Sequence, residues 1–178
     1  MNDMRLVVWF FPILFIFHDF EEIIFMQPWI GKNKIYLGER FPKLSKRIVL
    51  HFEKITTSSF ALGVAEEYSL LTIVTVISYM THWYSLWLGL FMAFTFHLII
   101  HCLQALMVRK YVPALITSII CLPICLSIIQ HIILSFSWYT IFFYSLAGII
   151  IMVVNLLLIH YGMDRFSTWL AHYEQQGE

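Results

Sequence analysis

Charged residues are scarce in this sequence. Asp, Glu, Lys and Arg together make up 12% of its 178 residues, whereas an ordinary soluble domain contains roughly 25%. Hydrophobic residues account for 60% of the chain. This composition excludes an ordinary soluble domain and predicts an integral membrane protein.

Cysteine and glycine are also rare. The three cysteines all fall in apolar segments, so the sequence offers no disulfide framework. No glycine-rich nucleotide-binding loop and no internal repeat occurs. Residues 4–27 are too long for the apolar core of a signal peptide and lack a small-residue cleavage site, so this segment is expected to be retained. We expect membrane lipid, and not nucleic acid, as the partner.

The apolar residues gather into five runs, each long enough to cross a bilayer as a helix of roughly 20 residues. These runs fall at about 4–27, 57–81, 84–107, 112–134 and 138–161. Two of the connectors between them are very short and leave no room for a second domain. We therefore predict a single all-α membrane domain over residues 1–178, a bundle of five transmembrane helices.

Basic residues predict the orientation of this bundle. Most of them lie in the 28–56 loop, and only Arg5 falls on the opposite side. Positive residues collect on the cytoplasmic face, so we expect the N-terminus outside and the C-terminus in the cytoplasm of a multi-pass bacterial inner-membrane protein. Basic and apolar residues are mixed over 43–55, which is typical of a short helix on an anionic leaflet or of an ordinary basic loop.

Five acidic side chains lie inside the apolar runs. They are Asp19, Glu21 and Glu22 in the first run and Glu66 and Glu67 in the second. An ionised carboxylate at the bilayer centre costs about 2.5–3.5 kcal/mol on insertion scales, so such residues are rare and usually functional. A metal ion placed among acidic and histidine side chains would make such a cluster tolerable in hydrocarbon.

Several polar groups share one depth in the inner half of the membrane. With a rise of about 1.5 Å per residue, they lie roughly 8–15 Å from the cytoplasmic ends of their helices. These groups are His18, Glu22, Glu66, Glu67, His97, His101 and Asn155. His18 precedes Glu22 by four residues and His97 precedes His101 by four, so each pair projects from one helix face. The sequence predicts that candidate metal ligands converge on one point: His18, Glu22, one of Glu66 and Glu67, and at least one of His97 and His101. Asn155 is expected to be a contact between helices.

The segment His18-Asp19-Phe20-Glu21-Glu22 resembles the signature of the HXXEE-domain proteins. These are small bacterial multi-span membrane proteins named for that motif, and the length and hydropathy of the chain fit the family throughout. The resemblance implies that His18, Glu21 and Glu22 are the motif residues. It implies no catalytic mechanism.

The motif also has the spacing of a metal-binding helix. In the H-x-x-E-H helix of zinc hydrolases, the outer residues bind the ion and a glutamate acts as general base. By this pattern His18 and Glu22 are ligands, Glu21 is the catalytic base, and His97 and His101 complete a set suited to zinc. Zinc lowers the pKa of bound water towards about 7, which predicts a metal-dependent hydrolase that acts on a lipid or membrane-associated substrate from the inner leaflet.

Two other functions could use the same residues. Di-iron proteins place glutamates and histidines on facing helices of a bundle, so the four glutamates and three histidines could hold iron in a membrane oxidase or hydroxylase. Buried acids and histidines also form relays in metal or proton transporters, and hydrogen bonding between helices without any metal is a further alternative. The histidines expected in loops or at interfaces, with no predicted role, are His51, His82, His160 and His172.

Overall fold

The structure, a computed structural model, describes residues 2–175 and contains no strand in that range. Its five long helices are α2 (Phe10–Arg40), α4 (Thr57–Thr81), α5 (Tyr84–Val108), α6 (Leu115–Ile132) and α7 (Trp138–Gln175). Its short elements are α1 (Asn2–Val7), α3 (Pro42–Phe52) and the 3-10 turn η1 (Ile133–Ser135). The all-α prediction is confirmed.

Four segments are long and apolar enough to cross a membrane, namely α4, α5, α6 together with η1, and most of α7. The remaining long helix, α2, carries three acidic residues within its apolar part. Large apolar side chains cover the outer surface, such as Phe142 and Leu157, which are 64% and 68% exposed. Exposed apolar surface of this extent marks a face that meets another apolar phase, as a multi-pass membrane protein requires.

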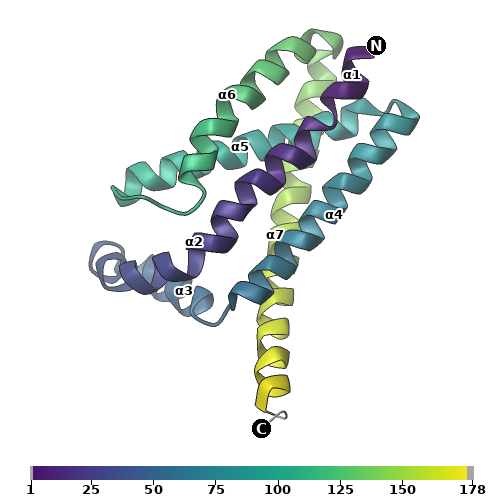
Figure 1. The fold of residues 1–178 in the computed structure, drawn as a ribbon. Coiled ribbons are helices and arrows are strands. Elements are labelled where there is room, and N and C mark those ends of the chain that lie inside the picture. The colour runs from purple at the N-terminus through teal and green to yellow at the C-terminus, as the bar shows by residue number, and fades with distance from the viewer. Residues whose placement is uncertain (1, 176–178) are drawn as a thin grey trace.

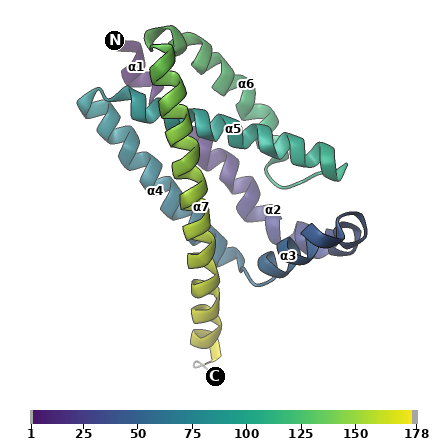
Figure 2. The same ribbon diagram turned by 180° about the vertical axis from the view of Figure 1, so that it is seen from behind.

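The helices are arranged around α2 and α5. Figure 1 shows α2 and α4 running side by side, with α6 on the other flank of α2 and α7 crossing behind. In the reverse view α7 lies in front of α5, and its C-terminal part extends beyond the other helices (Figure 2). A Cβ atom at Gly89 would overlap the Tyr144 backbone, and one at Gly148 would overlap the backbone of Gly89. Only glycine therefore allows this close crossing of α5 and α7.

Aromatic packing fixes α5 against the start of α2. Trp87 and Phe91 are fully buried and stack with their ring centroids 4.7 Å apart, and the ring of Phe11 meets both edge-on. The Trp87 indole donates a hydrogen bond to the Val8 carbonyl over 3.1 Å. This bond falls where the helix is interrupted between α1 and α2, so the first apolar run forms two helices instead of one.

The helix boundaries between residues 57 and 108 follow the sequence closely. The second run forms α4 over the expected residues, and its first turn is capped by Thr56, whose side chain accepts a hydrogen bond from the Ser59 backbone. His82 adopts a left-handed conformation with φ 61°, which reverses the chain between α4 and α5. This short connector thus places α4 beside α5.

The 28–56 segment differs from the extramembrane loop that was expected. α2 continues through Pro28 to Arg40, and α3 follows directly. Contacts with the end of α5 and the connector after it hold this extension: Trp29 donates to the Tyr111 carbonyl over 2.6 Å, and Tyr36 donates to the Val108 carbonyl over 2.8 Å. These tertiary bonds outweigh the single backbone bond that Pro28 removes. The side chains of Arg47, Ile48 and Leu50, on which the leaflet-helix prediction depends, lie outside the described residues.

α7 also extends beyond its predicted end at residue 161. Met163 is buried beside Gly63 of α4, where the sulfur and Cγ lie close to the position that a Cβ would take. One turn later, the Ser167 hydroxyl lies 2.6 Å from the Ser59 hydroxyl. Small polar residues therefore dock this part of α7 onto the start of α4, a pairing that hydropathy does not reveal.

Candidate metal centre

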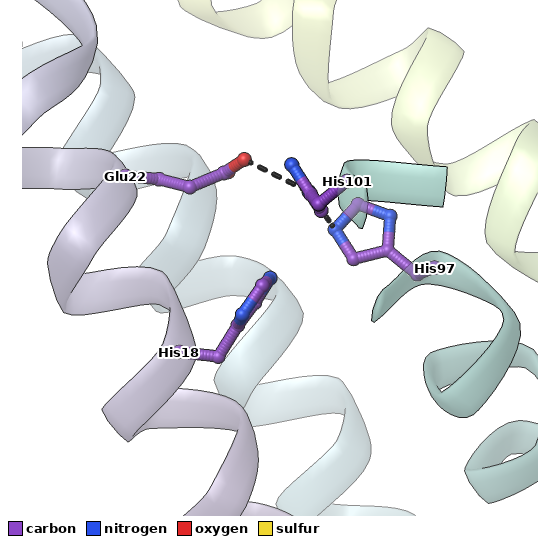
Figure 3. A group of neighbouring side chains, drawn as sticks. All are labelled: His18, Glu22, His97 and His101. Atoms are coloured by element: carbon purple, nitrogen blue, oxygen red, sulfur yellow. Dashed lines mark hydrogen bonds and ion pairs between the residues drawn. The ribbon is translucent and has the colours of Figure 1, made fainter. Parts of the chain in front are cut away.

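Four predicted ligands meet between α2 and α5. His18 and Glu22 come from α2, and His97 and His101 come from α5 (Figure 3). One nitrogen or oxygen atom from each side chain lies within 4.8 Å of the others. The His101 Nε2 atom is 2.9 Å from His97 Nε2 and 3.2 Å from the Glu22 carboxylate. We call these four residues the metal cluster.

The metal cluster is largely buried, yet two of its ring nitrogens lack a hydrogen-bond partner. His18 is fully buried, and His101 and Glu22 are 5% and 9% exposed. Among the described residues, the buried Nε2 of His18 and Nδ1 of His101 have no hydrogen-bond partner. Buried polar atoms are normally paired, because an unpaired one costs roughly 1–3 kcal/mol. A cation at the centre would pair with the His18 nitrogen.

A hydrogen-bonded chain fixes the proton of His18. The Thr117 hydroxyl donates to the Glu21 carboxylate over 2.7 Å, because a carboxylate only accepts. The Thr117 oxygen therefore accepts from Nδ1 of His18, which is 3.2 Å away. The unprotonated nitrogen is then Nε2, the atom without a partner. A support of this kind behind a histidine, from a carboxylate or hydroxyl, is typical of metal ligands.

Glu21 faces away from the metal cluster. Its carboxylate accepts hydrogen bonds from the Tyr111 hydroxyl, from the backbone N–H groups of Ile116 and Thr117, and from the Thr117 hydroxyl. α6 begins after Ala114, which has no side chain able to cap it. Glu21 therefore caps α6 from a neighbouring helix, where a negative charge also complements the helix dipole.

Tyr111 supports this cap from outside the apolar spans. Burial, and then the hydrogen bond to Glu21, raise the pKa of the Tyr111 phenol well above its ordinary value. The phenol therefore stays a proton donor, and its hydroxyl lies 2.7 Å from the Glu21 carboxylate. No sequence pattern marks Tyr111 or Thr117, because a tyrosine and a threonine at a short connector are common in membrane proteins of any function.

The adjacent residues Glu66 and Glu67 lie in different environments. Glu66 is exposed, and the Asn155 amide donates to it over 3.3 Å, which links α4 to α7. Glu67 instead lines the same cavity as Glu22 and Asp19. Neither glutamate belongs to the group of four converging ligands. Asp19 was predicted only as a buried acid, and it places the unpartnered Oδ2 atom in this region.

A cavity of about 500 Å³ adjoins the metal cluster. Glu22, His97 and His101 form part of its wall, and most of the remaining wall is apolar. The apolar lining includes Met26, Ile30, Phe60, Val64, Met152, Leu156 and Met163. This volume falls in the range of about 300–1,000 Å³ seen for ligand pockets, which combine apolar walls with a few polar groups.

The donor set of three imidazoles and one carboxylate suits a single divalent transition-metal ion. Zinc takes nitrogen and carboxylate ligands in such numbers, and imidazole also suits iron. The interatomic distances are those of side chains in mutual contact, and an ion would lie between them. The chemistry available to a bound ion depends on the cavity, because the metal cluster borders the cavity on one side.

A family model described as "Protein of unknown function with HXXEE motif" matches residues 9–128. No curated protein and no solved structure matches the chain significantly. The match covers α2, which carries the motif. Within the motif, His18 and Glu22 belong to the metal cluster, while Glu21 caps α6. With its motif in place and most of its length matched, the chain belongs to the HXXEE family.

Proposed function

We propose that this protein is a metal-dependent membrane hydrolase that acts on a lipid or membrane-associated substrate from the inner leaflet. The observation that carries the proposal is the metal cluster on the wall of a large apolar cavity. Ligands for a Lewis-acidic ion and room for an apolar substrate thus occur in one place. A purely structural metal site has no need of an adjoining cavity.

α2 serves as a fifth transmembrane helix in this proposal. Its three acidic residues, Asp19, Glu21 and Glu22, are at most 9% exposed, so they would not face lipid. Charged residues within spans are tolerated when they face the bundle interior. The basic residues of α3 and of the end of α2 then lie on the cytoplasmic side, and the N-terminus lies outside.

His18, Glu22, His97 and His101 would hold the ion, for which zinc is the best fit. Bound zinc lowers the pKa of a water molecule towards about 7 and polarises a carbonyl or phosphoryl oxygen. His18 is oriented for this task by Thr117 and Glu21. The buried α2–α5 interface excludes bulk water on the side away from the cavity.

Glu67 is better placed than Glu21 to act as general base. Both Glu21 oxygens are engaged by donors from the Tyr111–Thr117 segment, whereas Glu67 borders the cavity beside Glu22 and His97. Glu67 would accept a proton from water at this wall and return it to the leaving group. The apolar wall would hold the chain of the substrate, with its scissile bond next to the metal cluster.

Glu67→Gln tests this assignment, with Glu66→Gln as the matched control. Glu66 is the neighbouring glutamate on the same helix but is exposed and bonded to Asn155. In proteoliposomes of labelled glycerophospholipid, Glu67→Gln should retain its metal and lose roughly 10²–10⁴-fold in turnover, the usual contribution of a general base. Glu66→Gln should retain both its metal and its turnover. Wild-type turnover in Glu67→Gln would contradict the base assignment, and absence of hydrolysis by metal-loaded wild-type protein would contradict the hydrolase.

One observation favours a di-metal oxidase or hydroxylase as the second candidate. Asp19 is 4% exposed, has an unpartnered Oδ2 atom, and lines the cavity with Glu22 and Glu67. Three carboxylates beside three imidazoles could hold a second ion, as in di-iron bundles. Two irons per chain, with oxygen consumption in the presence of lipid, would establish this candidate in place of the hydrolase.

A further inference from the structure

A second histidine pair lies where α3 meets α7. Nε2 of His51 is 3.1 Å from Nδ1 of His160. On its other side, Nδ1 of His51 is 3.5 Å from the carboxylate of Asp164. His160 also lines the large cavity. We call His160, His51 and Asp164 the histidine relay, because the three groups follow one another in series.

The order of contacts sets the protons in this relay. The Asp164 carboxylate can only accept, so Nδ1 of His51 carries the proton that faces it. A neutral His51 then accepts at Nε2, and Nδ1 of His160 is the donor. Nε2 of His160 is left as a proton acceptor on a residue of the cavity wall. This arrangement is that of a base oriented by two supporting groups.

The relay joins an apolar interior to the molecular surface. The Phe52 ring lies edge-on to His51 and His160, with centroid separations of 5.4 and 5.8 Å. Phe52 also packs on the apolar cluster of Ile55, Phe60, Val64 and Met163, none of which titrates. At the far end, the Asp164 side chain is 42% exposed. A proton taken up at His160 therefore has a path to water through His51 and Asp164.

We propose that this relay binds long-chain carboxylic acids, with the chain in the cavity and the head group against His160. The acid would give its proton to Nε2 of His160. His160 then carries the positive charge beside the carboxylate, and His51, which accepts from Nδ1 of His160 and faces Asp164 with its own Nδ1, stabilises that charge. No further reactant is needed, and the acid remains as its carboxylate.

Ordinary acid strengths favour this transfer. A carboxylic acid with a pKa of about 4.3 is a stronger acid than imidazolium, with a pKa of about 6.5. An alcohol head group would be far too weak an acid to protonate a histidine, so the relay selects an acid. The site does not depend on the metal cluster. We further infer that the acid is a product of lipid hydrolysis at the metal cluster, and this inference alone rests on the proposed function.

Dodecanoic acid labelled with ¹³C at its carboxyl group tests this site in the full-length protein reconstituted in nanodiscs. The ¹³C shift of the bound acid reports its ionisation as pH is varied. In the wild type, the apparent pKa of the bound acid should lie roughly one to three units below that in His160→Gln, because His160 stabilises the carboxylate. His172→Gln, on an exposed residue of the same helix, should behave as the wild type.

A second variant guards against misfolding of His160→Gln. His51→Gln breaks the series at its middle residue and should raise the apparent pKa of the bound acid in the same direction. Equal titrations in the wild type and both variants, or a signal no different from nanodiscs without protein, would overturn the proposal. Metal content should be unchanged in both variants, so failure of the relay and failure of the metal cluster would be seen separately.

Discussion

The two histidine groups of this protein differ in the direction of their lone pairs. In the metal cluster, ligand atoms of four side chains converge to within 4.8 Å of one another. In the histidine relay, both nitrogens of His51 and Nδ1 of His160 each face one partner, and the groups form a line from the cavity to the surface. The first group is deeply buried, and the second ends at an aspartate that is 42% exposed.

This difference separates cation binding from proton transfer. Converging lone pairs leave an atom such as Nε2 of His18 without a partner until a cation arrives. In the series, a hydrogen bond joins the two histidines and an ion-pair contact joins His51 to Asp164, so these contacts form without an ion between the groups. Both arrangements use imidazole, so residue type does not decide the chemistry. The contacts that support each histidine decide the chemistry, and each contact can be removed by a single substitution.

Thr117→Val should produce the largest effect among these supporting contacts. It removes the hydroxyl between Glu21 and His18 while keeping the shape of the side chain. Loss of such support typically lowers metal affinity by about 10–100-fold. Competition with a metal chelator measures the affinity. Thr95→Val is the control, because the hydroxyl of buried Thr95 donates to the Phe91 carbonyl of its own helix and not to a member of the metal cluster.

If Thr117→Val bound metal as tightly as Thr95→Val, the hydrogen-bonded chain behind His18 would have no part in metal binding. The metal cluster would then resemble the histidine relay in needing only its direct contacts. The contrast between the two groups would lose its physical basis.

Glu21→Gln should have a smaller effect, on stability. The amide can no longer accept from every donor at the start of α6, and charged hydrogen bonds contribute about 1.5–3 kcal/mol each. We expect the melting temperature in detergent to fall by roughly 5 °C. Glu39→Gln, an exposed glutamate on the same helix, should leave it unchanged. Equal melting temperatures for the two variants would argue against the capping role.

Asp164→Ala should have the smallest effect and act only on the relay. Without the carboxylate, His51 loses the group that holds a proton on Nδ1. Imidazole ¹⁵N shifts should show a smaller share of the Nδ1–H form of His51 at neutral pH. Thr168→Ala, one turn away on α7, should not change it. A His51 spectrum that is the same in both variants would show that Asp164 does not set the tautomer.

Much of the fold could be predicted because apolar runs and short connectors carry direct information. The run at 57–81 coincides with α4, since it contains no proline that would interrupt the helix. The continuation of α2 through Pro28 could not be predicted, because it depends on hydrogen bonds from Trp29 and Tyr36 to a distant connector. The docking of α7 through Ser167 likewise depends on a partner 108 residues away in the sequence.

The candidate site was predictable where helical spacing decides it. Four-residue spacing places His18 with Glu22 and His97 with His101 on common faces, and the structure brings these pairs together. Spacing could not decide which of Glu21 and Glu22 faces the other pair, since both are within one turn of His18. The N-terminus of α6 decides it, because its backbone N–H groups bind Glu21 and leave Glu22 to the metal cluster. The base role of Glu21 stays a prediction, and Glu67 is the stronger candidate.

Metal analysis of the full-length protein, purified in detergent without chelator, tests the central claim most directly. The wild type should contain one divalent ion per chain. His101→Ala should contain almost none, because it removes the imidazole that contacts both His97 and Glu22, while His160→Gln should keep a full ion. Wild-type protein without metal after exposure to zinc and iron, or a full ion in His101→Ala, would contradict the assignment of the metal cluster.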